Sequence, residues 1–340
     1  MFKKLNEFRE ARREKERLGN DLARAKRELG ETHEALSTAH DRIARQSRRI
    51  KRLLEGGEDP GGIRAENVVW IFGAGRTGST WLSAMMGEFE GHVAWREPLV
   101  GALFGNLYYE RAKHLIGRGG KHYILGDAYR ESWLKSIRAF VLREASARFP
   151  EAAGPRNYLV VKEPNGSLGA PLLSEALPES RMILLIRDPR DVVASSMDAR
   201  REGGWKYARR ARMGVGPLAE EDLDAFVRGR AQDYFKRIAH TKQAYEAHRG
   251  PKVLVRYEEL RANALATMRR IYSTLGIVVD EEELSRVVEK HSWENIPEEQ
   301  KGEGKFYRKA TPGGWREDLS PEQARIVEEA TRPLLEEHYP

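Results

Sequence analysis

The sequence predicts an α/β fold in which a parallel sheet of about four or five strands is flanked by helices. Short runs rich in β-branched and aromatic residues, such as residues 68–72 and 182–186, have the continuous apolar character of strands buried on both faces. Longer segments with helical spacing separate these runs, and the first 55 residues carry a seven-residue repeat. With 340 residues, the chain has the length of one large domain and an added helical segment.

Residues 1–55 predict an α-helical coiled coil, and residues 56–62 predict a flexible linker. Apolar side chains recur at one position of the repeat, namely Leu22, Leu29, Leu36, Ile43 and Ile50. The second position holds alanine, threonine and glutamine as well as leucine, which is typical of a weak coiled coil, and a single solvated helix is the alternative interpretation. We expect this segment to mediate homo-oligomerisation or docking to a partner, and the globular domain to span residues 63–340.

Charge and composition exclude several classes of protein. The net charge is +7, but residues 1–55 hold 16 Lys or Arg against 10 Asp or Glu, so the globular part is close to neutral and nucleic-acid binding is not predicted. The chain has no cysteine, which excludes disulfides and thiolate metal sites and fits a reducing compartment. No apolar run approaches the ~20 residues of a membrane-spanning helix, and the N-terminus lacks an apolar signal core, so we expect a cytoplasmic protein.

A phosphate-binding turn is predicted directly after the first strand. Gly73, Gly75 and Gly78 interrupt the apolar run, and a helix is predicted to begin at Ser79. Backbone N–H groups in such a strand–turn–helix unit converge on an anion, together with the positive end of the helix dipole. The nucleotide-kinase loop, G-x-x-x-x-G-K-S/T, has the same glycine spacing, but Ser79 stands where that loop has its lysine, and the one cation is Arg76. An ordinary P-loop NTPase is therefore disfavoured.

The turn reads Arg76-Thr77-Gly78-Ser79-Thr80-Trp81-Leu82, which resembles the 5′-phosphosulfate loop of sulfotransferases. Members of this family transfer a sulfuryl group from 3′-phosphoadenosine 5′-phosphosulfate (PAPS) and leave adenosine 3′,5′-bisphosphate (PAP). The resemblance implies a single P-loop-like domain and a reaction that requires no metal. It also implies that the nucleotide contacts the loop residues Gly75, Arg76, Thr77, Gly78, Ser79, Thr80 and Trp81.

A second phosphate motif follows the strand predicted at residues 182–186. Arg187 ends the strand, Pro189 opens a helix, and Ser195 lies eight positions after the arginine. The pattern resembles the 3′-phosphate motif of the same family, R-D/N-P-R/K-D-x-x-x-S. An arginine at a strand end and a serine in the next helix can converge on one phosphate, whose oxygens match the planar guanidinium. The resemblance implies that Arg187 and Ser195 hold the 3′-phosphate.

Residues at two further strand ends carry the predicted chemistry. The apolar run 158–161 ends in Lys162, and the carboxyl end of a central strand is where an open α/β sheet binds ligands. The resemblance implies that Lys162 and Arg76 stabilise the transferring sulfuryl group. It also implies that Glu97, which follows a short strand at residues 92–96, is the general base.

The assignment of Glu97 has alternatives. In the first alternative, Glu97 is a surface carboxylate paired with Arg96. Cytosolic sulfotransferases of small molecules use a histidine as the base, and His92, His114 and His122 lie nearby in the sequence. Carbohydrate and tyrosyl-protein sulfotransferases carry a glutamate just after this strand, so the glutamate is our prediction.

Two later elements also resemble parts of the family. The sequence R-Y-E-E-L places Tyr257 at a strand-to-helix corner, either near the adenine or in the core. A late loop, R-K-A-T-P-G-G-W, resembles the family's R-K-G-x-x-G-D-W and implies that Arg308 and Lys309 meet the 3′-phosphate. Ala310 and Gly314 replace a glycine and an aspartate of that pattern, which puts its backbone contacts in question.

The predicted reaction is sulfuryl transfer from PAPS to an acceptor hydroxyl, with a carbohydrate or glycolipid as the predicted acceptor. The basic segment 204–217 is either a lid or part of the acceptor site, and the aromatic residues between 100 and 150 either line an acceptor cleft or form core. Two other classes stay open. One is a nucleotide kinase, for which Asp188 is the only supporting acidic residue, and the other is a catalytically inactive scaffold that acts through its coiled coil.

Overall fold

The computed structural model describes most of the chain after residue 61. The described residues are Thr38, 62–111, 121–205, 207, 216, 218–302, 305, 307 and 309–339. The chain divides into two units, Met1–Asp59 and Pro60–Pro340, and only Thr38 of the first is described. The predicted coiled coil and linker therefore lie outside the described residues, apart from Thr38 and Gly62, and they stay predictions.

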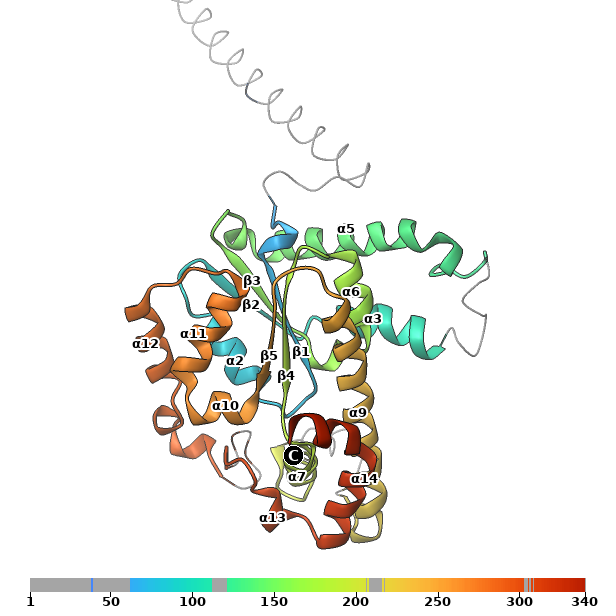
Figure 1. The fold of residues 1–340 in the computed structure, drawn as a ribbon, viewed down its shortest axis with the longest axis vertical. Coiled ribbons are helices and arrows are strands. Elements are labelled where there is room, and N and C mark those ends of the chain that lie inside the picture. The colour runs from blue at the N-terminus through green and yellow to red at the C-terminus, as the bar shows by residue number, and fades with distance from the viewer. Residues whose placement is uncertain are drawn as a thin grey trace, which may run out of the picture. The chain divides into compact units, whose positions relative to one another are not determined.

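Five parallel strands form the central sheet, which confirms the predicted fold class (Figure 1). The strands are β1 (Val68–Gly73), β2 (His92–Arg96), β3 (Tyr158–Lys162), β4 (Arg181–Ile186) and β5 (Lys252–Arg256). Their order in the sheet is β2-β3-β1-β4-β5, and every neighbouring pair is parallel. Because β3 and β4 lie on either side of β1, the carboxyl end of β1 is a topological switch point, where open α/β sheets bind their ligands.

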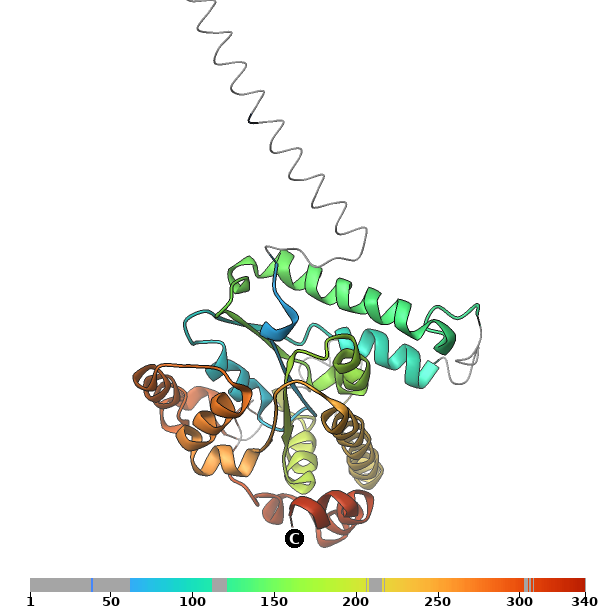
Figure 2. The ribbon, with the colours of Figure 1, turned by 45° about the horizontal axis from the view of Figure 1, so that its top comes forward.

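Helices cover both faces of the sheet (Figures 1 and 2). One face carries α2 (Ser79–Met86), α10 (Tyr257–Ala262), α11 (Ala264–Leu275) and α12 (Glu281–Lys290). The other face carries α3 (Val100–Gly105), α5 (Arg130–Arg148), α6 (Ala170–Ala176) and α9 (Leu223–Ala247). Beyond the carboxyl ends of the strands lie α7 (Pro189–Asp198), α13 (Trp315–Asp318) and α14 (Pro321–His338). The remaining helical segments are short. All are 3₁₀ segments except η2, which is π-helical: η1 (Ala65–Asn67), η2 (Asn106–Arg111), η3 (Asp127–Tyr129), η4 (Pro150–Ala152), η5 (Pro164–Gly169), η6 (Glu220–Asp222), η7 (Trp293–Asn295) and η8 (Glu298–Gln300).

Alternate side chains of β1 enter two separate cores. Val69 and Ile71 pack with residues of α2 and α11, whereas Trp70 and Phe72 pack with residues of α5 and α6 on the other face. All four side chains are fully buried, which explains why this strand is a continuous apolar run. The indole N–H of Trp70 donates to Oγ of Ser180 at 3.2 Å, so its polar atom is satisfied. The strand that carries the phosphate turn is therefore fixed from both sides.

The helix α3 crosses η5 in a backbone-to-backbone contact. Gly101 and Gly105 of the helix face Gly166 and Gly169 of the turn. A Cβ atom at Gly101 would lie 2.2 Å from the carbonyl oxygen of Gly166, so a larger residue cannot be placed there without displacing the backbone. This close approach places the start of α3 beside the carboxyl end of β3.

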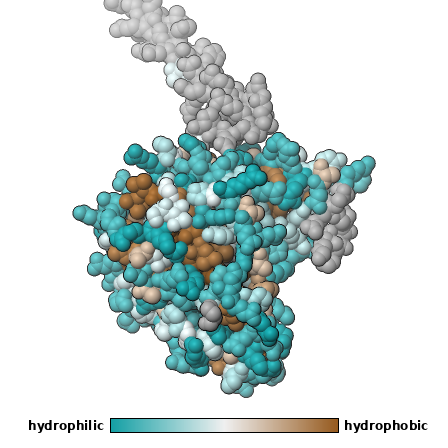
Figure 3. Space-filling model, in the orientation of Figure 1, coloured by the Kyte–Doolittle hydropathy of each residue, from teal (hydrophilic) through white to brown (hydrophobic). Residues whose placement is uncertain are grey.

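The surface seen in Figure 3 is mainly hydrophilic, and its apolar side chains form small separate patches. Large apolar residues exposed in the described part include Leu99, Leu103, Ile124 and Val278. Scattered exposure of this kind is ordinary in globular proteins. Among the described residues, no helix is both long and apolar enough to cross a membrane.

Candidate active site

The predicted motifs converge on one cavity at the carboxyl edge of the sheet. Its volume is about 730 Å³, which lies in the usual range of small-molecule sites. The predicted residues that line it are Gly75, Arg76, Gly78, Ser79, Thr80, Trp81, Glu97, Lys162, Arg187, Ser195, Tyr257 and Lys309. Thr77 does not line the cavity, and Arg308 lies outside the described residues.

The turn between β1 and α2 has the backbone shape of an anion-binding loop. Gly78 is the N-cap of α2 and has a φ of 88°, in the left-handed region that favours glycine. Arg76 has a φ of 77°, which is uncommon for a residue with a side chain. The N–H groups in the first turn of α2 have no acceptor within the helix, so they and the helix dipole favour an anion here.

Hydrogen bonds within the turn and from α9 stabilise its conformation. The hydroxyl of Thr77, a fully buried residue, donates to the carbonyl oxygen of Ala74 at 2.8 Å, which directs the side chain away from the cavity. Nη2 of Arg230 on α9 donates to the carbonyl oxygen of Gly75 at 3.0 Å. Arg230 also pairs with Asp233 at 2.6 Å. The predicted role of Thr77 is therefore restricted to its backbone.

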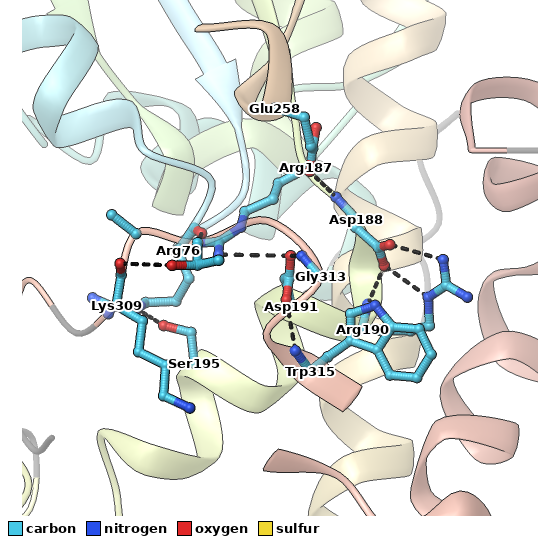
Figure 4. Close-up of polar contacts among 12 residues, drawn as sticks. Arg76, Arg187, Asp188, Arg190, Asp191, Ser195, Glu258, Lys309, Gly313 and Trp315 are labelled. Atoms are coloured by element: carbon cyan, nitrogen blue, oxygen red, sulfur yellow. Dashed lines mark hydrogen bonds and ion pairs between the residues drawn. The ribbon is translucent and has the colours of Figure 1, made fainter. Parts of the chain in front are cut away.

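Arg187 and Ser195 each contact Arg76 (Figure 4). Nη1 of Arg187, at the end of β4, donates to the carbonyl oxygen of Arg76 at 3.2 Å. Nε of Arg76 donates to Oγ of Ser195 on α7 at 3.0 Å. Side chains from the loop, a strand end and a helix thus concentrate two positive charges at one side of the cavity.

Tyr257 lies between the loop and Arg187. A Cβ atom at Gly78 would lie 2.5 Å from the tyrosine ring, so the ring packs directly on the glycine. The guanidinium of Arg187 lies 4.2 Å from the ring centroid, a cation–π contact, and Trp81 meets the ring edge-on at 6.4 Å. Only 5% of Tyr257 is exposed, and the residue also lines the cavity, so its place near the adenine stays a prediction.

Asp191 ties the late loop to α7 (Figure 4). Its carboxylate accepts hydrogen bonds from the backbone N–H groups of Gly313 at 2.8 Å and Trp315 at 3.0 Å. Burial raises the pKa of Asp191, and the Arg187 guanidinium at 3.8 Å opposes that rise. One buried carboxylate therefore links the second phosphate motif to the late loop.

The late loop has a left-handed backbone at the position where the family pattern has a glycine. Ala310 stands where the pattern has a glycine, and its φ is 50°, in the left-handed region. Nε of Arg261 donates to the carbonyl oxygen of Ala310 at 3.2 Å. The neighbouring Lys309 lines the cavity, and its Nζ lies 2.7 Å from a carboxylate oxygen of Glu317.

Asp188 holds the start of α7. Its carboxylate accepts from the backbone N–H of Arg190 at 2.9 Å and pairs with the guanidinium of the same residue at 2.8 Å. The backbone N–H of Asp188 donates in turn to Glu258 at 2.9 Å. Asp188 does not line the cavity. The one acidic residue that supported a kinase is thus engaged as a helix cap.

Glu97 and Lys162 face each other on the other side of β1. The register of β2 and β3 pairs Arg96 with Lys162, which brings the ends of these strands together. Nζ of Lys162 lies 2.5 Å from Oε1 of Glu97 and donates to Oγ1 of Thr80 at 3.3 Å. Nδ2 of Asn165 donates to the second carboxylate oxygen at 2.7 Å. Within the described residues, Glu97 makes no ion pair with Arg96.

The histidines considered as alternative bases lie elsewhere. His92 is buried at the start of β2, and burial lowers its pKa. His122 is exposed and does not line the cavity, while His114 lies outside the described residues. His291 does line the cavity, but its Nε2 lies 2.5 Å from a carboxylate oxygen of Glu88.

Several lining residues were not assigned to the site from the sequence. Asn165 directly follows the Lys-Glu-Pro element. Its closeness to Lys162 in the sequence could therefore have indicated that it belongs to the site. Trp205 belongs to the segment 204–217, most of which lies outside the described residues. The others are Pro164, Arg200, Arg261, His291, Trp293, Ile296, Tyr307, Ala310 and Thr311. Most of these come from irregular segments, whose placement depends on tertiary packing that a motif does not encode.

Solved sulfotransferases resemble this fold at low sequence identity. Mouse sulfotransferase SULT7A1 complexed with PAP shares 13% identity at a TM-score of 0.48, over 81% of this chain and 86% of that one. Sulfotransferase STF9 from Mycobacterium avium shares 13% identity at a TM-score of 0.47, over 85% of this chain and 79% of that one.

Curated relatives resemble part of the chain more closely. Cytosolic sulfotransferase 17 of Arabidopsis thaliana is 27% identical over 193 residues, which are 49% of this chain and 52% of the relative. Cytosolic sulfotransferase 16 of the same plant is 27% identical over 188 residues, 48% and 52% of the two chains. This chain spans about half the length of the curated relatives it matches. The sulfotransferase domain family itself matches residues 66–338. That match covers both phosphate motifs and the cavity between them, and this chain therefore belongs to the sulfotransferase family.

Proposed function

We propose that this chain transfers a sulfuryl group from PAPS to the hydroxyl group of an acceptor. The observation that carries the proposal is the pair Glu97 and Lys162, 2.5 Å apart, on the same cavity as two phosphate-binding motifs. A carboxylate that can take a proton and a cation that can stabilise a leaving group are the two groups that such a transfer needs.

The donor nucleotide is proposed to bind across the carboxyl end of β1. Backbone N–H groups of residues 75–80 would hold the 5′-phosphosulfate at the N-terminus of α2. Trp81 and Tyr257 offer aromatic surface to the adenine. The residues proposed to hold the 3′-phosphate are Arg187, Ser195, Arg308 and Lys309. When bound, PAPS supplies an activated sulfuryl group on a good phosphate leaving group.

Glu97 is proposed as the general base. As the acceptor oxygen forms its bond to sulfur, the bond from sulfur to the phosphate oxygen breaks, and the hydroxyl proton passes to the Glu97 carboxylate. Lys162 and Arg76 would stabilise the charge that develops on the oxygens of the transferring and leaving groups. Asn165, which donates to the second oxygen of Glu97, would keep the base oriented.

A carbohydrate or glycolipid is our proposed acceptor. A glutamate base resembles that of carbohydrate and tyrosyl-protein sulfotransferases, whereas cytosolic small-molecule enzymes use a histidine. Aromatic side chains of Trp205, Trp293 and Tyr307 line the cavity, and sugar rings pack well on such amphipathic surfaces. The proposal also includes a cytoplasmic location and oligomerisation or partner docking through residues 1–55.

Calorimetric titration with PAP, and in parallel with ADP and Mg²⁺, tests the donor site. We expect PAP to bind at least about tenfold more tightly, because ADP lacks the 3′-phosphate that Arg187 would bind by charge-assisted hydrogen bonds. Preference for ADP with Mg²⁺ would revive the kinase alternative, and binding of neither nucleotide would favour an inactive scaffold.

Transfer from radiolabelled PAPS to a panel of acceptors tests the reaction. The panel contains simple glycosides, glycolipids, p-nitrophenol and a tyrosine-containing peptide. Labelled product is expected with the sugar compounds and is expected to persist in the presence of EDTA. Transfer to p-nitrophenol alone would contradict the proposed acceptor class while supporting the reaction.

Replacement of Gly78 by alanine is expected to weaken PAP binding by at least about tenfold. The new Cβ would lie 2.5 Å from the ring of Tyr257, at a residue whose φ is 88°. The left-handed conformation alone costs about 1–2 kcal/mol for a residue with a side chain. Calorimetry with PAP measures the affinity, and thermal unfolding measures the stability.

Gly276→Ala is the matched control for this variant. Gly276 also has a positive φ, 65°, but a Cβ atom there would meet nothing within 4 Å. Gly276→Ala should lose only the stability that the left-handed conformation costs and should keep its PAP affinity. Equal affinities in the two variants would show that the contact between Gly78 and Tyr257 does not shape the loop.

A further inference from the structure

A buried carboxylate outside the cavity holds the segment that carries Glu97. Glu163, directly after β3, is fully buried and does not line the cavity. Its two carboxylate oxygens accept hydrogen bonds from the backbone N–H groups of Leu99 at 3.0 Å and Gly101 at 3.2 Å. Leu99 is the N-cap of α3, and its own side chain makes no capping bond. Glu163 therefore supplies the cap of α3 from another element of the fold.

The segment under this carboxylate has an unusual backbone. Glu97 has a φ of 52° and Leu99 a φ of 60°, and neither is a glycine. Non-glycine residues keep left-handed conformations only where the surrounding structure holds them there. Two groups do so here: the carbonyl oxygen of Lys162, which accepts from the N–H of Glu97 at 2.8 Å, and the carboxylate of Glu163.

The Glu163 side chain is closely packed against Gly166. A Cβ atom at Gly166 would lie 1.9 Å from Oε1 of Glu163, so the carboxylate occupies the space that this glycine leaves open. The backbone N–H of Glu163 donates to the carbonyl oxygen of Ile71 in β1 at 3.0 Å. The backbone of Glu163 is thus bonded to the central strand, and its carboxylate is directed at the start of α3.

We propose that Glu163 is a positioning residue whose ionised carboxylate holds residues 97–101 so that Glu97 faces Lys162 and the cavity. The inference rests on the proposed role of Glu97 as the base. Protonation of Glu163 weakens its acceptance of the two N–H groups, because a neutral carboxyl group is a poorer acceptor and has one oxygen occupied by the proton. The segment then loses a cap, and the orientation of Glu97 becomes less defined.

The electrostatic setting places this protonation close to neutral pH. Burial raises the pKa of Glu163 to about 7, against the lowering effect of the bonds from Leu99 and Gly101; the charge of Glu97 raises it further and that of Lys162 lowers it. The elements β1, α3 and η5 contribute no titratable side chain. From α9, the charged side chain of Arg237 reaches η5, where it donates to the carbonyl oxygen of Asn165 at 2.9 Å.

The direction of the Glu163 pKa shift predicts how stability depends on pH. The folded-state pKa lies above the ordinary value of 4.5, so the folded form binds this proton more tightly than the unfolded form. The contribution of Glu163 to stability therefore falls as the pH rises from about 4.5 to about 7. Over the upper part of the same range, the hold on residues 97–101 strengthens. Local order at these residues and global stability should change in opposite directions.

Amide hydrogen exchange on the full chain saturated with PAP tests the inference. Protection factors of Leu99 and Gly101, corrected for intrinsic rates, are measured between pH 5.5 and 8.5, a window of about 1.5 units on either side of the expected midpoint. In the parent chain they should rise at least about tenfold across pH 7. In Glu163→Gln they should be low and independent of pH. If the protection factors of Leu99 and Gly101 in the parent chain do not change with pH, the inference is overturned. This part of the experiment needs no variant.

Glu258→Gln is the matched control. Glu258 is a partly buried glutamate whose pKa is likewise raised by burial and whose carboxylate accepts from a backbone N–H, that of Asp188. Protection at Leu99 and Gly101 should follow the parent in this variant. Retained PAP binding shows that Glu163→Gln is folded. The exchange measurement needs no acceptor, so an active Glu97→Gln variant would refute the proposed base without touching this result.

Discussion

Glu97→Gln is expected to lower kcat by about 10²–10⁴-fold and to leave PAP affinity within about twofold. The amide keeps the shape of the side chain but cannot accept the proton of the acceptor hydroxyl. It contacts none of the residues proposed to hold the 3′-phosphate, so donor binding should persist. Steady-state rates with the best acceptor of the panel give kcat, and calorimetry gives the PAP affinity.

The control for this variant is Glu110→Gln. Glu110 is exposed at the end of η2, where it pairs with Lys236 at 2.6 Å, and it does not line the cavity. Its kcat should equal that of the parent. A kcat in Glu97→Gln within threefold of the parent would contradict the assignment and return attention to His291.

Arg187→Ala is expected to weaken PAP binding by about 100-fold and ADP binding by less than about threefold. A charge-assisted hydrogen bond contributes about 1.5–3 kcal/mol, and the guanidinium can form two with one phosphate. ADP lacks the 3′-phosphate and loses none of these bonds. Parallel titrations with the two nucleotides measure the difference directly.

Arg138→Ala is the matched control for the loss of an arginine. Arg138 pairs with Glu179 at 2.7 Å on α5, away from the cavity. Both affinities should stay at the parent values in this variant. Equal losses of PAP and ADP affinity in Arg187→Ala would sink its assignment to the 3′-phosphate and indicate a disturbed fold, because Asp191 also loses its nearest cation.

The residues at strand ends were predictable from the sequence. Lys162 and Arg187 each follow a short apolar run, and parallel strands place their carboxyl ends at one edge of the sheet. A strand, a glycine-rich turn and a helix in succession can adopt few conformations, so the turn around Gly78 could also be predicted from the sequence. The start of the last helix has a similarly local signal, because Ser320 precedes Pro321 and forms a capping box with Gln323.

Contacts between segments distant in the sequence were not predictable. Asp191 looked like one acidic residue of a motif, and only the fold reveals that it binds the late loop 122 positions away. The packing of Tyr257 on Gly78 and the capping of α3 by Glu163 have the same character. Each depends on which loop comes to lie over which strand, and local propensity carries no information on that.

The position of β1 between β3 and β4 has a consequence for how such an enzyme can diversify. The groups proposed to hold the 3′-phosphate come from the end of β4, from α7 and from the late loop, whereas Glu97 follows β2, Lys162 ends β3 and Asn165 lies in η5. Under the proposed roles, substitutions near the end of β2 are therefore expected to change the use of the acceptor more than the affinity for the 3′-phosphate.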